Sequence, residues 1–230
     1  MLNWGLCIAG SYLLGSIPFG FLIGKAKGID IREVGSKNVG ATNVGRVLGR
    51  SFGITCFFLD MGKGAMPVIV AGAMNGLLGQ DVVGMEASQI WLWLAVAFAS
   101  VLGHMCSPFL GFKGGKGVAT GFGSMLAMWP LLTLPALGAM VVWYGVLKLT
   151  RYVSVASMLA ATSLPIGYFL RILPPKAMDQ PLSQTAQYIM HASAPLIVTV
   201  AMALLIAYKH RTNIARLRQG TEPKHGSPVE

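Results

Sequence analysis

Long apolar runs separated by short polar segments constrain the fold of this chain more than any other feature. A helix needs about 20 apolar residues to cross a hydrocarbon core of about 30 Å. Only 11% of the residues are charged, whereas a soluble domain carries about 25%. The sequence therefore predicts an all-α integral membrane protein. The apolar runs lie at about residues 2–24, 52–78, 88–109, 118–130, 131–147, 152–170 and 188–208.

The fourth and fifth runs follow each other closely. We divide them at Trp129-Pro130 and Leu134-Pro135, because proline interrupts a helix. This division predicts seven transmembrane helices in a single polytopic domain over residues 1–230, with the two termini on opposite sides. One bent helix over residues 118–147 would leave six spans instead.

Lysine and arginine are distributed unevenly along the chain. Segments 25–50, 111–117, 148–151 and 209–224 hold most of the 18 Lys and Arg residues. Cytoplasmic loops carry such an excess. Seven spans place all four segments and the C-terminus in the cytoplasm and the N-terminus outside, whereas six spans would put the third and fourth segments on the wrong side. Topology explains most of this charge, and we expect no nucleic-acid partner.

Residues 111–120 form a glycine-rich loop with the sequence G-F-K-G-G-K-G-V-A-T. Glycine lets the backbone turn tightly and expose its N–H groups, and Lys113 and Lys116 add positive charge. A helix that begins near Val118 would point its positive end at the same place. The loop does not match the G-x-x-x-x-G-K-[ST] pattern. The glycine-rich loop predicts a phosphate site at the membrane edge, with a plain helix–helix connector as the alternative.

Two further polar segments share the predicted cytoplasmic side. Residues 35–46 read G-S-K-N-V-G-A-T-N-V-G-R, and their Ser, Thr and Asn side chains form hydrogen bonds without net charge. Arg46 can grip two oxygens of one phosphate. Residues 210–217 read H-R-T-N-I-A-R-L, and in a continuing helix His210 and Asn213 share a face. An ordinary flexible loop and a basic stop signal are the alternatives for these two segments.

Three ionisable residues fall within or near the apolar runs. Asp60 and Lys63 are spaced to pair on one helical face, and charges within a span are usually paired. We favour a structural pair over a substrate contact for Lys63. His104 is equally compatible with a packed core residue and with a site residue. No acidic or His/Cys cluster has metal-ligand spacing, so we expect no metal site.

These segments resemble the signature motifs of the acyl-phosphate-dependent glycerol-3-phosphate acyltransferases, the bacterial PlsY family. The three motifs correspond to Gly35 to Arg46, Phe112 to Thr120 and His210 to Leu217, and an L-D-x-x-K-G element corresponds to Leu59 to Gly64. The resemblance covers nearly the whole chain. One departure is Lys37 and Val39, which replace a small residue and a proline of the first motif.

The resemblance implies transfer of a fatty acyl group from acyl phosphate to the sn-1 hydroxyl of glycerol 3-phosphate. The products are lysophosphatidic acid and inorganic phosphate, and no cofactor is expected. It also implies a bacterial plasma (inner) membrane location with a cytoplasmic active site. The sequence leaves the oligomeric state open, with a monomer as one option, and it does not reveal the acyl-chain preference.

Motif position also implies roles for individual residues. His210, Asn213 and Ser36 are the expected catalytic residues, with His210 and Asn213 orienting the attacking hydroxyl. The proton would pass to His210 or to a substrate phosphate. The expected partners of glycerol 3-phosphate are Ser36, Arg46, Lys113 and Lys116, and those of acyl phosphate are Thr42, Asn43, Gly114 and Gly115.

Two other functions remain compatible with the sequence. A small transporter for a phosphorylated metabolite would also need basic loops, but it would more often show internal duplication and polar residues at the bilayer midplane. A membrane acyltransferase with another donor is the second alternative. No G-x-S-x-G elbow is present, so a covalent acyl-serine is not expected.

Overall fold

The computed structural model describes residues 4–172 and 182–227, with side chains in the last long helix described from residue 188 onward. Every regular element in this part of the chain is helical, as expected from the apolar runs. The α-helices are α1 (Trp4–Gly15), α2 (Phe19–Ala26), α3 (Ala41–Leu48), α4 (Arg50–Met74), α5 (Ala87–Met105), α6 (Val118–Leu126), α7 (Thr133–Thr150), α8 (Val153–Ile172), α9 (Leu182–Lys209) and α10 (Arg211–Arg218), with 3-10 turns η1 (Val82–Gly84) and η2 (Pro108–Leu110).

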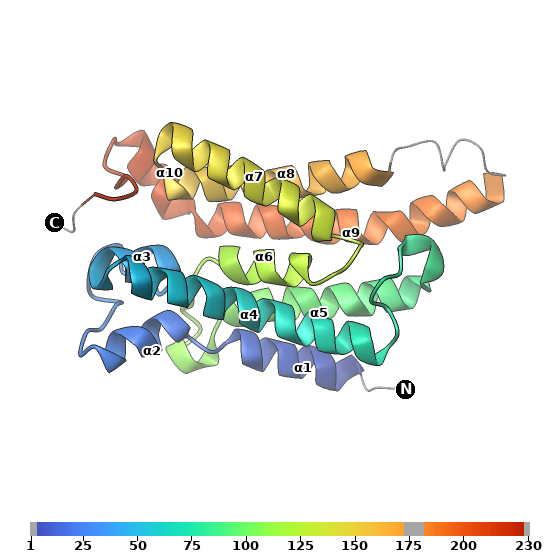
Figure 1. Ribbon diagram of the computed structural model, residues 1–230, viewed down its shortest axis with the longest axis horizontal. Coiled ribbons are helices and arrows are strands. Elements are labelled where there is room, and N and C mark those ends of the chain that lie inside the picture. Colours follow the sequence, from blue (N-terminus) through green and yellow to red (C-terminus); the bar gives the residue numbers. More distant parts are fainter. Residues whose placement is uncertain (1–3, 173–181, 228–230) are drawn as a thin grey trace.

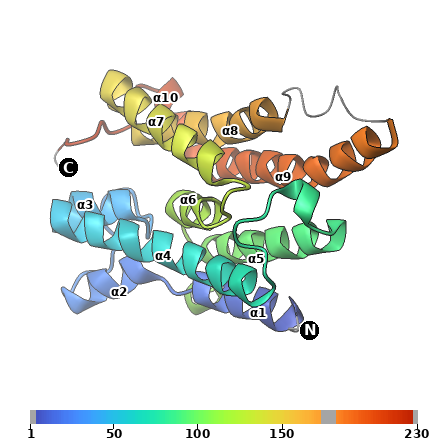
Figure 2. The ribbon, with the colours of Figure 1, turned by 45° about the vertical axis from the view of Figure 1, so that its right-hand side comes forward.

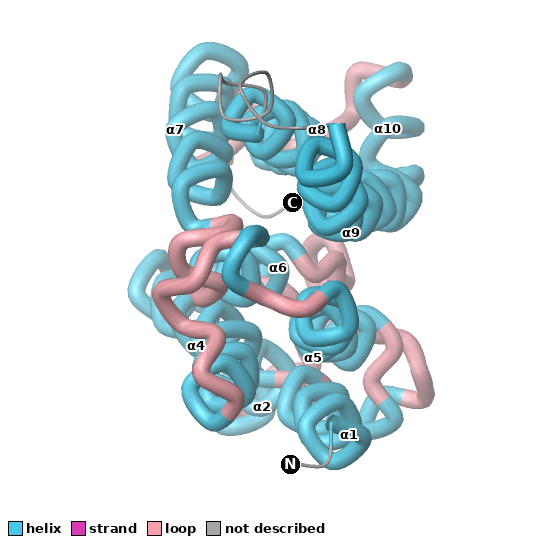
Figure 3. Tube along the Cα trace, turned by 90° about the vertical axis from the view of Figure 1, so that its right-hand side faces the viewer, coloured by secondary structure: helices cyan, strands magenta, loops and turns pink. Residues whose placement is uncertain are grey.

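The helices form two groups with α6 between them (Figures 1 and 3). One group contains α1 to α5, and the other contains α7 to α10. Figure 2 shows the same division from a second direction. Exposed leucines, isoleucines and valines cover the long helices, among them Leu6, Val141 and Leu204. A molecule that turns so much apolar surface outward is suited to lipid.

Close helix contacts in the first group depend on glycine. A Cβ atom at Gly15 of α1 would collide with the backbone of Ser100 in α5, and one at Gly103 of α5 would collide with the carbonyl of Tyr12. The same holds where Gly64 of α4 meets the carbonyl of Thr120 in α6. Small residues let membrane helices approach closely. These contacts fix α5 and α6 beside the helices that flank the polar site.

Six segments of the described chain are long and apolar enough to cross a membrane. They are Trp4–Ala26, Arg50–Met74, Ala87–Leu110, Thr133–Thr150, Val153–Ile172 and Tyr188–Lys209. They correspond to six of the seven predicted runs; residues 2 and 3 of the first run lie outside the described part. The first run is interrupted, because α1 ends at Gly15 and α2 begins at Phe19, after Pro18. Proline has no backbone N–H to donate to a helical hydrogen bond, so Pro18 favours a break at this point.

The predicted run 118–130 is represented by α6, which has only nine residues. A helix of this length covers about 14 Å, which is too short to cross the hydrocarbon core. The predicted division near Trp129-Pro130 agrees with the structure, because α6 ends at Leu126 and α7 begins at Thr133. The predicted break at Leu134-Pro135 is wrong, since Pro135 lies in the first turn of α7, where a proline is tolerated. After α6 the chain reaches the far end of α4, where the N–H of Gly79 donates to the carbonyl of Trp129 at 3.0 Å.

Contacts at the two ends of the molecule show how the chain runs between them. At one end, Arg171 in the last turn of α8 donates to the carbonyl of Leu131 at 2.9 Å and pairs with Asp81 at 2.9 Å. At the other end, Ser154 at the start of α8 donates to Glu222 at 2.7 Å. The short α6 and the segment after it therefore lead from the glycine-rich end to the opposite end.

Candidate active site

The three predicted polar segments meet at one end of the helices. They surround a cavity of about 130 Å³. Residues from the α2–α3 connection, the glycine loop and α10 line it, although these are distant in sequence. Among the lining residues are Ser36, Thr42, Asn43, Arg46, Asp60, His104, Lys116, Ser154, His210, Asn213, Arg216 and Glu222. The three segments therefore contribute to one cavity.

Asn43 organises the first segment. Its side-chain oxygen accepts a hydrogen bond from the N–H of Ser36 at 2.8 Å, and its side-chain nitrogen donates to the carbonyls of Ile31 and Val34 at 3.1 Å. Asn43 is 1% exposed. Its amide is thus occupied in holding the loop that carries Ser36. Thr42, the neighbouring residue, is exposed and lines the cavity.

The predicted residues of the glycine loop have different positions: some line the cavity, and others hold the loop in place. The N–H groups of Gly114 and Gly115 donate to the carbonyls of Met105 and His104 at 3.2 and 3.0 Å. Neither glycine lines the cavity, and Lys113 is exposed away from it. The structure therefore brings Lys116, but not Lys113, Gly114 or Gly115, to the cavity wall.

The N-terminus of α6 also faces the cavity. Gly117 has φ 78°, a left-handed conformation that suits glycine, and helix α6 starts immediately after it. Gly117, Val118 and Ala119 line the cavity. The first N–H groups of a helix lack partners within the helix and favour an anion. This part of the sequence prediction depended on the helix beginning near Val118, and it does.

Lys116 links the glycine loop to α10. Its ammonium group donates to the side-chain oxygen of Asn213. Burial lowers the pKa of Lys116 to about 8; Glu222 opposes this shift, and Arg216 and Arg46 reinforce it. At neutral pH the ammonium form still predominates. Lys116 therefore places a partly desolvated positive charge at the cavity wall.

His210 and Asn213 both line the cavity, although the helix does not continue unbroken as expected. Helix α9 ends at Lys209, and α10 begins at Arg211. The Nδ1 atom of His210 lies 2.8 Å from the carbonyl of Ile206. Burial and the nearby Lys116 lower the pKa of His210 to about 4. Because a carbonyl only accepts, Nδ1 carries the proton of the neutral ring and Nε2 keeps a free lone pair.

Sequence reasoning missed Glu222 and Ser154. Glu222 accepts hydrogen bonds from Ser154 at 2.7 Å, from Asn213 at 2.7 Å and from Arg216 at 2.8 Å. Burial raises the pKa of Glu222, but these bonds outweigh it and lower the pKa below its ordinary value. An acidic residue within an otherwise basic tail was the available signal. Glu222 ties the tail, α8 and α10 together and orients the Asn213 amide.

Positive charge exceeds negative charge around the cavity. Arg46, Lys116 and Arg216 line it, against the two acids Glu222 and Asp60, and Asp60 is itself paired with Lys63. Burial lowers the pKa of Arg46, and the described hydrogen bonds and ion pairs do not engage its guanidinium. Uncompensated charge at a partly buried site is costly. A bound anion would relieve that cost.

An apolar groove of about 970 Å³ adjoins the polar cavity. It lies between α4 and α6 on one side and α7, α8 and α9 on the other. Thr42, Arg46, Phe57, Val118 and Trp143 are among the residues that line both spaces. Ile54 and Phe58 of α4 line the groove while being 45% and 57% exposed on the lipid-facing surface. The groove thus joins the polar cavity to the apolar exterior.

The predicted pair of Asp60 and Lys63 is confirmed. Their side chains lie 2.8 Å apart and are 3% and 2% exposed. Among the described residues, no group of three or more His, Cys, Asp and Glu side chains is placed to hold a metal ion.

Comparisons with known proteins agree with this geometry. A family profile described as Glycerol-3-phosphate acyltransferase matches residues 5–220. The chain is similar to glycerol-3-phosphate acyltransferases of Geobacter metallireducens, with 45% identity over 94% of this chain and 95% of the relative, and of Acholeplasma laidlawii, with 40% identity over 96% and 92%.

A solved structure shows the same likeness in three dimensions. The crystal structure of PlsY, an integral membrane glycerol 3-phosphate acyltransferase, in its glycerol 3-phosphate form is 39% identical, with a TM-score of 0.77 over 97% of this chain and 96% of that one. These findings favour an enzyme over the transporter alternative. The chain therefore belongs to the glycerol-3-phosphate acyltransferase family and is an integral membrane enzyme of that activity.

Proposed function

We propose that this enzyme takes its acyl group from acyl phosphate and transfers it to the sn-1 hydroxyl of glycerol 3-phosphate, without an acyl-enzyme. The observation that carries the proposal is the junction of a cation-rich cavity with a long apolar groove. Both substrates carry phosphate, and one carries a fatty chain. A polar space with excess positive charge and an adjoining apolar space match these requirements.

Glycerol 3-phosphate occupies the polar cavity in this proposal. Arg46 and Lys116 bind its phosphate, with the hydroxyl of Ser36 as a further partner. Arg46 supports this role because its guanidinium is unpaired among the described residues and lines the cavity. An arginine fork suits a phosphate, which accepts two parallel hydrogen bonds. Lys113 is omitted, since it is exposed and does not line the cavity.

His210 and Asn213 orient the attacking hydroxyl. The free Nε2 lone pair of His210 accepts a hydrogen bond from that hydroxyl. Asn213 is held on both sides, by Lys116 and by Glu222. A rigidly held amide positions a substrate group better than a mobile one.

The acyl phosphate lies across the boundary between the two spaces. Its chain follows the apolar groove, and its phosphate meets Thr42 and the N-terminus of α6, which adjoin both. Asn43, Gly114 and Gly115 act indirectly, because their polar groups already hold the loops. A helix N-terminus with free N–H groups stabilises a phosphate that gains charge as it leaves.

The proposed reaction is a direct displacement at the acyl carbonyl. The sn-1 oxygen forms a bond to the carbonyl carbon, and the bond from that carbon to the phosphate oxygen breaks. The phosphate leaves with the electron pair, and the hydroxyl proton passes through His210 Nε2 to the departing phosphate. Burial, and then repulsion by Lys116, lower the pKa of His210 and make the ring a weak base. Two substrate phosphates near His210 would offset the repulsion by Lys116. Acyl phosphate has a good leaving group, so positioning supplies much of the acceleration.

The donor is tested with purified protein and radiolabelled glycerol 3-phosphate. We expect lysophosphatidic acid and inorganic phosphate in equal amounts when palmitoyl phosphate is supplied, and no product with palmitoyl-CoA or palmitoyl-acyl carrier protein. Product formation from either thioester without acyl phosphate would contradict the proposal. With palmitoyl phosphate labelled in its acyl chain, a protein–acyl adduct that passes its acyl group to glycerol 3-phosphate would contradict direct attack.

We also propose that the chain makes seven passes through a bacterial inner membrane, with its N-terminus outside and the active site in the cytoplasm. The support is that α6, although short, leads the chain from the glycine loop to the end where Arg171 and Asp81 pair. The basic segments cluster at the opposite end, as expected for a cytoplasmic face.

Cysteine labelling in intact cells tests this orientation. A membrane-impermeant maleimide should modify Val83→Cys, whose position is 75% exposed, and should modify Thr221→Cys only after the cells are opened. The wild-type chain, whose three cysteines lie within or at the end of helices, gives the background. Labelling of Thr221→Cys in intact cells would reverse the proposed orientation.

A further inference from the structure

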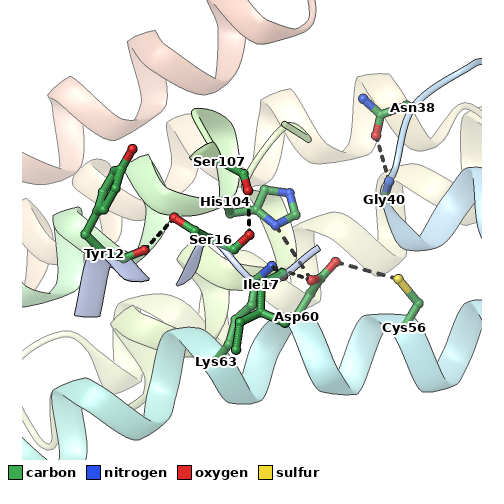
Figure 4. Close-up of polar contacts among 10 residues, drawn as sticks. All are labelled: Tyr12, Ser16, Ile17, Asn38, Gly40, Cys56, Asp60, Lys63, His104 and Ser107. Atoms are coloured by element: carbon green, nitrogen blue, oxygen red, sulfur yellow. Dashed lines mark hydrogen bonds and ion pairs between the residues drawn. The ribbon is translucent and has the colours of Figure 1, made fainter. Parts of the chain in front are cut away.

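His104 lies beneath the glycine loop and is not used by the reaction proposed above. It belongs to the last turn of α5 and is 7% exposed. Its Nδ1 atom lies 3.6 Å from Asp60 Oδ1 of α4 (Figure 4). Both side chains also line the polar cavity. His104 is thus a buried histidine that lies beside a buried carboxylate at the wall of the proposed anion site. The reaction proposed above gives it no function.

The Asp60 carboxylate is shared between two helices. It pairs with Lys63 of the same helix at 2.8 Å and faces His104 of α5. Lys63 also donates to the carbonyl of Ile17 at 2.6 Å (Figure 4). The Asp60–Lys63 pair is complete without His104, so a purely structural ion pair does not explain why the carboxylate also faces the imidazole. The Asp60 carboxylate also faces Nδ1 of the His104 ring at 3.6 Å, where it can orient the ring by attracting an N–H at that position.

The glycine loop rests directly on the His104 ring. A Cβ atom at position 115 would collide with His104 Nε2. The backbone repeats this contact, because the N–H of Gly115 donates to the carbonyl of His104 at 3.0 Å. The next residue is Lys116, whose ammonium reaches Asn213 across the cavity. The His104 ring therefore helps to set the distance between α5 and the glycine loop, and Lys116 extends from this loop.

We propose that His104, oriented by Asp60, is a positioning residue that holds Gly115 and thereby places Lys116 against the phosphate of glycerol 3-phosphate. This inference rests on the proposed binding of that phosphate in the polar cavity. The path has three contacts: carboxylate to imidazole, imidazole to loop backbone, and loop lysine to substrate. Neither Asp60 nor His104 itself needs to touch a reacting atom.

Steady-state kinetics of His104→Ala test the proposal. Because a small displacement of a binding group costs roughly 100-fold in rate, we expect kcat/KM for glycerol 3-phosphate to fall about 100-fold. The KM for the acyl donor should change less than about threefold, since the groove is untouched. Added imidazole should restore part of the lost kcat/KM by filling the vacated space. Equal losses for both substrates, or no rescue, would overturn the proposal.

His191→Ala is the matched control. His191 is also a buried histidine, 8% exposed, but it contacts Val82 at the other end of the molecule. It should leave both KM values unchanged and should not respond to imidazole. A similar selective loss with His191→Ala would show that general weakening of the fold produces the effect. If His104→Ala does not fold, His104→Gln is decisive, and wild-type kinetics in that variant would overturn the proposal.

Coupling between Asp60 and His104 is tested by a double-mutant cycle with Asp60→Asn and His104→Ala. If Asp60 acts through the ring, the double variant should lose no more kcat/KM for glycerol 3-phosphate than His104→Ala alone. Multiplied losses would mean that Asp60 acts elsewhere, and would remove it from the proposed path.

Direct binding separates this proposal from the proposed donor and site. Calorimetry with glycerol 3-phosphate alone should show binding to the wild type and at least tenfold weaker binding to His104→Ala. Wild-type binding that Lys116→Met does not weaken would refute the proposed phosphate site itself. Wild-type binding weakened by Lys116→Met but not by His104→Ala would refute only the positioning role. The donor does not enter this measurement.

Discussion

Replacing Arg46 with alanine is expected to lower kcat/KM for glycerol 3-phosphate by about 100- to 1000-fold, the range seen when one preorganised electrostatic contact is removed. The guanidinium is partly buried, lines both the cavity and the groove, and is not engaged by the described hydrogen bonds or ion pairs. Its removal should therefore cost little stability while removing a phosphate contact. Initial rates with purified protein, together with a thermal unfolding scan, measure both quantities.

Arg218→Ala is the matched control for this result. Arg218 is an exposed arginine at the end of α10 and does not line either space. It should keep wild-type kinetics, which would exclude a general effect of lost positive charge. Arg46→Lys should recover only part of the activity, since an ammonium cannot form the two parallel hydrogen bonds of an arginine fork. Normal activity of Arg46→Ala would show that the anion site is misplaced.

Filling the apolar groove is expected to exclude long acyl chains. Ala161 of α8 is half-buried and lines the groove, so Ala161→Trp adds bulk where a chain would lie. Each buried methylene contributes about 0.8 kcal/mol, and displacing four of them costs about 3 kcal/mol, or more than about 100-fold in kcat/KM. Palmitoyl phosphate should suffer this loss, whereas octanoyl phosphate should be affected far less. Assays with a series of chain lengths measure the difference.

Val141→Trp provides the comparison for the groove variant. Val141 of α7 is 73% exposed and does not line the groove. A tryptophan there meets lipid, and the chain-length profile should stay as in the wild type. Equal losses for octanoyl and palmitoyl phosphate in Ala161→Trp would indicate damaged packing and would argue against the groove as the site of the chain.

Much of the helical architecture could be predicted from hydrophobicity, because each crossing must satisfy its backbone hydrogen bonds internally. Six of the predicted runs match segments able to cross a membrane. The break before Phe19 was missed, although Pro18 signalled it, because most of the surrounding residues are apolar. The length of α6 could not be predicted from the sequence either, because its packing against Gly64 of α4 is a long-range contact.

The candidate site shows the same division between local and long-range information. Residue type, spacing and the family resemblance together pointed to Ser36, Arg46, Lys116, His210 and Asn213, and the structure places these residues around one cavity. They did not reveal which polar groups support the loops rather than face the cavity.

Which polar groups support the loops depends on three-dimensional contacts that residue type does not reveal. The amide of Asn43 is occupied by its own loop, and the N–H groups of Gly114 and Gly115 by α5. Glu222 was missed because its partners lie on α8 and α10, and the tail itself carries no periodic pattern.

The opening of the groove past Ile54 and Phe58 has a consequence for how this enzyme saturates. If the donor enters sideways from the leaflet, the concentration that determines the rate is its amount per unit of membrane area, not its amount per litre of solution. Diluting the protein and its lipid together should leave the rate per enzyme unchanged, while adding inert lipid at fixed donor should slow it. The monoacyl product can likewise slide out along the bilayer plane, so its hydrocarbon tail never has to enter water between one turnover and the next.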